Sequence, residues 1–233
     1  MPVITLSGEM TSGAREVGRR VASLLGIDFV DQQLMVEAAR RCGVPVGAVA
    51  AHDERSATFR QRISSAINSM LERSAATGGD PAAGGVGLEV VLSQTYADMA
   101  RGQEETGISD KRYLETMSVI IREIAESGRV VILGRGSQLI LRDMPRVLHV
   151  LCVAPPELRW ERLAKRESIP LEEAKKQAVQ YDQARAAFHK KFWKVDVEDP
   201  RLYDLTIDTA RLSYDASAEL IATAARIKTE QSD

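Results

Sequence analysis

The chain has 233 residues, 44% of them hydrophobic, and a formal net charge of −2, which suits one α/β domain and gives no general attraction for nucleic acid. Its two cysteines, Cys42 and Cys152, are too few for a disulfide scaffold and fit a reducing cytosol. No run approaches the ~20 apolar residues of a membrane span, and the first residues lack a basic leader. These features predict a soluble, cytoplasmic protein with no nucleic-acid or membrane partner.

A glycine-bounded loop near the start of the chain is the strongest local signal. The apolar run from Val3 to Leu6 predicts a strand, and the stretch from Gly8 to Gly18 then opens into an amphipathic helix. The first N–H groups of such a helix have no partner within it, and the helix dipole adds positive charge there. Strand, loop and helix in this order predict an anion site. The alternative is a strand–turn–helix corner with a solvated arginine.

The spacing of Gly8 and Gly13 is that of the phosphate-binding loop G-x-x-x-x-G-K-[ST], but the two following residues differ. Ala14 stands at the lysine position and Arg15 at the Ser or Thr position. A guanidinium grips phosphate oxygens, so Arg15 is a candidate to replace the lysine. The residues predicted to bind ATP are Gly8, Thr11, Ser12, Gly13, Ala14, Arg15 and Glu16.

The next part of the chain is divided between a short strand and a segment of different composition. A strand is expected over 27–30, ending before Asp31, and a helix over 32–41. From 44 to 112 the large aliphatic residues become sparse, and five of the eleven residues from Thr77 to Gly87 are glycine. Helices over 55–75 and 88–101 around this glycine-rich loop predict a helical insert beside the sheet, with 1–233 forming a single domain.

Strands and helices alternate again in the second half of the sequence. Strands are expected over 129–133, 147–153 and 202–208, and helices over 109–124, 156–166, 171–191 and 214–228. Continuous apolar strands that alternate with helices are typical of a parallel sheet covered on both faces. The pattern therefore predicts a three-layer α/β fold with a parallel five-stranded sheet.

The segment 155–195 is basic, with ten Lys or Arg residues against six Asp or Glu residues between Pro155 and Lys194. Arg159, Arg162 and Arg166 fall at i, i+3 and i+7, on one face of a helix. A mobile basic segment that closes over a phosphate is what phosphoryl transfer needs, so we interpret 155–195 as a lid. The alternative for each arginine is a solvated ion pair.

Three aromatic residues, Phe188, Phe192 and Trp193, stand among lysines near the end of this segment. They form either a stacking patch for nucleic acid or an anchor that holds the helix against the core. The anchor is the interpretation that we favour.

Several of these stretches together resemble the cytidylate kinase-like family of nucleoside monophosphate kinases. The opening V-I-T-L-S-G-E-M-T-S-G-A-R-E-V-G is similar to the family's lysine-free loop, S-R-E-x-G-S-G-G-R-E-I-G. The stretches V-V-I-L-G-R-G, R-V-L-H-V-L-C-V-A-P-P-E-L-R-W-E-R and Y-D-L-T-I-D-T resemble its later strands and helices. The resemblance implies a P-loop NTPase-like fold, with 44–112 as the acceptor-side insert and 155–195 as the lid.

The resemblance also implies roles for individual residues. Arg135 would hold the acceptor phosphate, and Asp182 would orient Arg185 or contact a ribose hydroxyl. ATP and Mg²⁺ are the implied cofactors, with Asp31 or Glu16 assisting the metal through water. The predicted catalytic residues are Arg15, Arg135, Arg162, Asp182 and Arg185.

The sequence departs from the family pattern at acidic positions. Gly136 replaces the aspartate of the family's G-R-D motif, Leu133 replaces an acidic residue, and Gln32 and Glu37 replace a serine and an arginine. The predicted activity is transfer of a phosphoryl group from ATP to a nucleoside monophosphate. A regulatory protein that binds a nucleotide without turnover, and a kinase of another small metabolite, stay open as alternatives.

Overall fold

A computed structural model describes residues 2–31, 96 and 110–230. Most of the expected insert over 44–112, and the helix expected over 32–41, lie outside the described residues and stay predictions. No helix in the described part of the chain combines the length and apolar character that crossing a membrane requires.

The centre of the fold is a five-stranded sheet in which every pairing is parallel, as the alternation of strands and helices predicted. The strand order is β2-β3-β1-β4-β5, so β3 and β4 flank β1 on opposite sides. At such a reversal of direction the loops leave a crevice beyond the carboxyl ends of the strands. The strands are β1 Val3–Gly8, β2 Asp28–Val30, β3 Val130–Leu133, β4 Val147–Val153 and β5 Leu205–Asp208.

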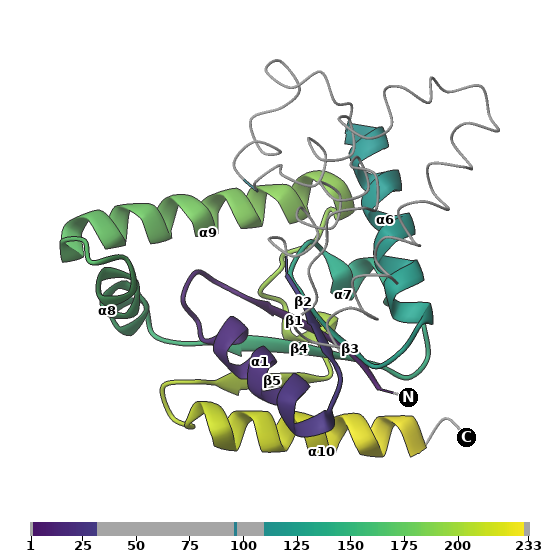
Figure 1. The fold of residues 1–233 in the computed structure, drawn as a ribbon. Helices are drawn as coiled ribbons and strands as arrows, with labels where there is room; N and C mark the ends of the chain where they lie inside the picture. Colours follow the sequence, from purple (N-terminus) through teal and green to yellow (C-terminus); the bar gives the residue numbers. More distant parts are fainter. Residues whose placement is uncertain (1, 32–95, 97–109, 231–233) are drawn as a thin grey trace, which may run out of the picture.

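Helices cover both faces of this sheet, giving three layers (Figure 1). Ile4 and Leu6 of β1 pack with α1 (Ala14–Leu25) and α10 (Tyr214–Glu230) on one face. Val3 of the same strand packs on the other face with α6 (Asp110–Glu126) and α7 (Ser137–Ile140). This division follows from the alternation of side chains along a strand. The three-layer α/β fold is confirmed.

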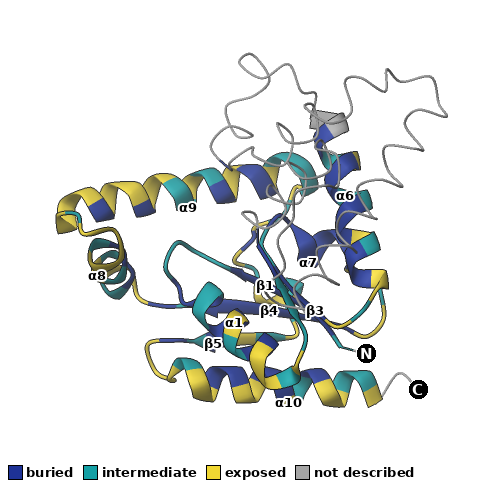
Figure 2. Cartoon of the chain, viewed as in Figure 1, coloured by how far each residue is buried: buried dark blue, intermediate teal, exposed yellow. Residues whose placement is uncertain are grey.

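The segment expected to form a lid consists of two helices, α8 (Pro156–Glu167) and α9 (Leu171–Trp193). They pack against each other through Leu163, Ala174 and Ala178. Figure 2 shows that α9 changes character along its length, with its first half largely exposed and its second half carrying buried residues such as Phe188. The second half of α9 is therefore part of the main core.

The last strand is shorter than expected, because it begins at Leu205 and not at 202. Pro200–Leu202 instead forms a single 3₁₀ turn, in which the Asp199 side chain accepts a hydrogen bond from the Arg201 N–H at 2.9 Å. Proline at the first position and a capping aspartate favour a helical turn over a strand at this point.

Candidate functional site

A cavity of about 410 Å³ lies beyond the carboxyl ends of β1 and β3. One wall is the loop that joins β1 to α1. The opposite wall comes from the turn after β3, from Tyr96 and from α9. Besides residues 7–16, the lining residues are Asp31, Tyr96, Leu133, Gly134, Arg135, Arg166, Glu167, Tyr181 and Arg185. The structure therefore brings the predicted loop residues, Arg135 and Arg185 to one cavity.

The loop has the backbone conformation of an anion site. Gly13 has φ of 90°, and the first intrahelical bond of α1 runs from the Val17 N–H to the Gly13 carbonyl at 2.9 Å. The three N–H groups before Val17 are therefore not used within the helix. A Cβ at Gly8 would lie 2.2 Å from Ser12 Oγ and 2.7 Å from the Cys152 carbonyl oxygen, so only glycine fits there.

The Ser12 hydroxyl in this loop is buried and makes no hydrogen bond within the described part of the chain. A buried polar group without a partner is costly unless a ligand or water satisfies it. This hydroxyl, together with the N–H groups at the start of α1 that are not used within the helix, fits a bound anion.

Arg15 and Asp31, which the sequence assigned to separate roles, form an ion pair. Arg15 Nη2 lies 3.2 Å from Asp31 Oδ2. The Arg15 side chain is 36% exposed and the Asp31 side chain 8% exposed. The cation beside the phosphate loop is therefore already balanced by a carboxylate.

Arg135 lies on the opposite wall, on a turn in which three consecutive residues have positive φ: Gly134 at 76°, Arg135 at 58° and Gly136 at 69°. Its backbone N–H donates to Tyr96 Oη at 3.0 Å, and its Nη1 donates to Tyr113 Oη at 3.1 Å. Burial raises the pKa of Tyr113, so this hydroxyl stays protonated. A non-glycine residue with positive φ is strained, and such strain is found preferentially at functional sites.

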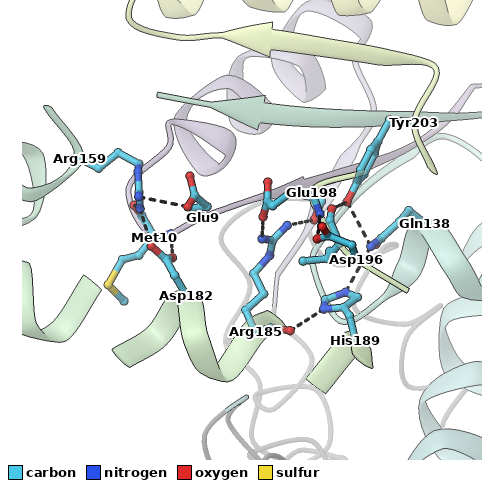
Figure 3. Close-up of polar contacts among 12 residues, drawn as sticks. Glu9, Met10, Gln138, Arg159, Asp182, Arg185, His189, Asp196, Glu198 and Tyr203 are labelled. Atoms are coloured by element: carbon cyan, nitrogen blue, oxygen red, sulfur yellow. Dashed lines mark hydrogen bonds and ion pairs between the residues drawn. The ribbon is translucent and has the colours of Figure 1, made fainter. Parts of the chain in front are cut away.

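Arg185 is 2% exposed and lies at the carboxyl end of β1 (Figure 3). Its Nη1 pairs with the Glu198 carboxylate, and its Nη2 donates to Ser7 Oγ at 2.8 Å. The His189 ring holds the Arg185 carbonyl oxygen through Nδ1 at 2.8 Å. Burial lowers the pKa of His189 to about 4, so the imidazole is neutral at physiological pH and its Nδ1–H is the donor.

Asp182 was expected to orient Arg185 or to contact a ribose hydroxyl, and the structure pairs it with a different arginine, Arg159. Asp182 Oδ2 accepts from Arg159 Nη1 at 2.7 Å, and Asp182 Oδ1 accepts from the Met10 N–H at 2.9 Å (Figure 3). Arg159 also pairs with Glu9 at 3.1 Å. Burial raises the pKa of Glu9, and the Arg159 guanidinium opposes this shift. Glu9 was not among the predicted site residues, although an acidic side chain within a phosphate loop was an available signal.

Arg162 was expected to be catalytic, but it does not line the cavity. Its guanidinium donates to the Thr209 hydroxyl and carbonyl oxygens, both at 2.9 Å, and lies 5.2 Å from the centre of the Tyr214 ring. These contacts fix the outer side of the phosphate loop, since Thr209 Oγ1 also donates to the Ser12 carbonyl at 2.7 Å. Arg166, one turn further along α8, is the arginine of this helix that lines the cavity.

The aromatic residues at the end of α9 anchor the helix, as favoured above. Phe188 is completely buried, and its ring centre lies 4.9 Å from that of Phe192 and 5.6 Å from that of Trp193. A Cβ at Gly136 would lie 2.4 Å from the Trp193 ring. The end of α9 is thus packed directly against the turn that carries Arg135.

The chain is similar to known proteins in sequence and in fold. The Cytidylate kinase-like family matches residues 3–211. A cytidylate kinase from Aeropyrum pernix is 33% identical over 132 residues, which cover 57% of this chain and 74% of that protein. A cytidylate kinase from Methanopyrus kandleri is 34% identical over 111 residues, covering 44% of this chain and 58% of that protein, which is less than two thirds of its length.

Among solved structures, an uncharacterized protein from Eubacterium ventriosum superposes with a TM-score of 0.62. It is 16% identical in sequence, and the superposition covers 97% of this chain and 98% of the other. At this identity the likeness concerns the fold alone. The match to the family over nearly the whole sequence, with the parallel sheet and the phosphate loop, shows a P-loop NTPase-like fold, and the chain belongs to the cytidylate kinase-like family.

Proposed function

We propose that this protein transfers the γ-phosphoryl group of ATP to a nucleoside monophosphate, with a cytidine nucleotide as the acceptor. The observation that carries the proposal is the pair of buried arginines, Arg135 and Arg185, across one cavity from a loop built for an anion. Two phosphorylated substrates that meet head to head need cationic groups on both sides of the moving group. The cytidylate kinases among its relatives support the choice of acceptor.

The transfer requires positioning and charge stabilisation more than covalent chemistry. The N–H groups that open α1, with Arg15, would hold the donor phosphates, and Arg135 would hold the acceptor phosphate. An acceptor phosphate oxygen attacks the γ-phosphorus, the bond from that phosphorus to the β–γ bridging oxygen breaks, and ADP leaves. Arginines fixed before the reaction stabilise the charge on the moving group without reorganisation.

The family implies magnesium, and the carboxylates that line this cavity could hold the ion only together with water and substrate phosphates. Asp31 and Glu16 are carboxylates in its lining, but the described residues contain no group of three or more His, Cys, Asp or Glu side chains able to hold a metal. Mg²⁺ readily keeps several waters and binds through substrate phosphates with one or two carboxylates. Asp31 and Glu16 would therefore hold it through water, and the ion would neutralise phosphate charge.

The segment 155–195 is proposed as the lid, and 44–112 as the insert that holds the acceptor. The lid would act in a cytoplasmic enzyme on small nucleotides, with no nucleic-acid or membrane partner. Within it, Arg166 and Arg185 are the arginines that line the cavity.

The proposal is tested by incubating the full chain with ATP, Mg²⁺ and one acceptor at a time: CMP, dCMP, UMP or AMP. We expect CMP or dCMP to give the highest rate of ADP formation, together with the matching diphosphate on anion-exchange chromatography. Tight ATP binding by calorimetry with no diphosphate from any of the four acceptors would refute nucleoside monophosphate kinase activity.

A second candidate function is nucleotide binding without turnover. The observation that favours it is the Arg15–Asp31 pair in a loop without lysine, because it leaves the donor side with less available charge. In the same experiment this candidate predicts ATP binding and no ADP formation. A kinase of another small metabolite would form ADP only when that metabolite is added.

A further inference from the structure

We infer that Arg159, held between Glu9 and Asp182, is a positioning residue that fixes the shape of the phosphate loop and does not itself bind phosphate. We call these three residues the loop latch. The consequence for ATP binding rests on the proposed function, whereas the effect on the loop itself does not.

The guanidinium of Arg159 donates four hydrogen bonds to the protein. Nη1 donates to Asp182 Oδ2 at 2.7 Å and to the Met10 carbonyl at 3.2 Å, while Nη2 contacts Glu9 Oε1 at 3.1 Å. Nε donates to the Ala154 carbonyl at 3.2 Å. The side chain is 4% exposed and is not part of the cavity lining. An arginine in this position reaches a bound nucleotide only through the loop.

The latch contacts two consecutive residues of the loop, Met10 and Thr11, through its residues on α8 and α9. The Met10 N–H donates to Asp182 and its carbonyl accepts from Arg159. The Thr11 hydroxyl donates to the carbonyl oxygen of Arg159 at 2.7 Å. Thr11 has φ of 55°, a conformation that a non-glycine residue keeps only when its surroundings impose it. The contacts to α8 and α9 supply that constraint.

The chemistry of the latch requires an arginine. The planar fork reaches two carboxylates on different elements, Glu9 on the loop and Asp182 on α9, at the same time. A lysine has one ammonium centre, so it cannot reproduce the contacts to both acids and both carbonyl oxygens. Because Arg159 lies on α8 and Asp182 on α9, the latch connects the loop to both helices of the proposed lid.

The test compares Arg159→Lys with Arg201→Lys in the full chain. Arg201 also pairs with an aspartate, Asp199, but is 88% exposed, so it controls for the loss of an arginine–carboxylate pair. We expect Arg159→Lys to weaken ATP binding about tenfold by calorimetry, since a slightly displaced loop loses much of its binding geometry. The amides of Met10 and Ser12 should exchange at least about tenfold faster, with the strand amides unchanged. Arg201→Lys should change neither measurement.

Unchanged exchange at Met10 and Ser12 in Arg159→Lys would overturn the latch, whatever happens to ATP binding. Faster exchange throughout the sheet would overturn it as well, because it would indicate general destabilisation. If Arg159→Lys does not fold, Asp182→Asn removes the ion pair at constant volume, and the same local change at Met10 is expected. A wild-type chain that fails to bind ATP would refute the proposed function, while the exchange data would still decide the latch.

Discussion

The two walls of the cavity are held in place by different interactions. The phosphate loop is fixed from outside by polar contacts, with Arg159 and Arg162 bonded to its backbone or to its neighbours. The turn that carries Arg135 is held by aromatic residues: Trp193 packs against Gly136, and the Tyr96 and Tyr113 hydroxyls accept hydrogen bonds from Arg135. The wall formed by the phosphate loop presents backbone N–H groups to the cavity. The opposite wall presents the side chains of Arg135 and Arg185.

The difference also appears in how far each arginine is fixed before a ligand binds. Arg135 and Arg185 are 4% and 2% exposed, whereas Arg15 on the loop wall is 36% exposed and paired with Asp31. A buried side chain has already lost its rotamer freedom on folding, so it orders at little further cost. We therefore propose that the side chains that stabilise charge on the moving group are concentrated on the wall opposite the loop.

The largest expected effect is therefore on that wall. Arg135→Ala should lower kcat/KM for the acceptor by about 100- to 1000-fold, the range for loss of one preorganised donor. The dissociation constant for ATP alone should stay within about twofold, because the loop is untouched. Steady-state kinetics and calorimetry on the same variant provide both numbers. Arg142→Ala, at a site 67% exposed just after α7, is the control. A comparable loss of ATP affinity would contradict the division between the walls.

A smaller effect is expected from the packing that supports Arg135. Gly136→Ala adds a Cβ 2.4 Å from the Trp193 ring at a φ of 69°, so it combines a clash with backbone strain. Gly26→Ala has a similar φ of 61° but no atom within 4 Å of the new Cβ, and it serves as the matched control. Urea unfolding should show a loss of about 1 kcal/mol for Gly26→Ala and about 2–4 kcal/mol for Gly136→Ala. Equal losses would mean that Trp193 moves aside without cost.

Most of the fold was predictable from the sequence because the signals involved are local. Strand and helix periodicity located the sheet, and the spacing of Gly8 and Gly13 located the loop. The start of the last strand was misplaced because a proline and a capping aspartate outweighed the apolar pattern at Leu202.

The partners of the charged side chains were not predictable in the same way. Asp182 and Arg185 are three residues apart on one helix, a spacing that favours contact, yet Asp182 pairs with Arg159 of another helix. Leu163, Ala174 and Ala178 pack α8 against α9, and this packing brings Arg159 to Asp182. The orientation that α8 takes in this packing also places Arg166 at the cavity and Arg162 beside Thr209.

The smallest expected effect is on the loop wall. Arg15→Ala removes a cation that is partly exposed and shared with Asp31, so ATP affinity should fall only about three- to tenfold. Part of that loss should come from the Asp31 carboxylate, which lines the cavity and repels phosphate more strongly once the Arg15 guanidinium is removed. The double variant Arg15→Ala/Asp31→Asn should therefore bind ATP more tightly than Arg15→Ala when Mg²⁺ is absent. Calorimetry with and without Mg²⁺ measures these differences. A fall of a hundredfold or more in Arg15→Ala would place the main phosphate-binding charge on the loop, contrary to the comparison of the two walls.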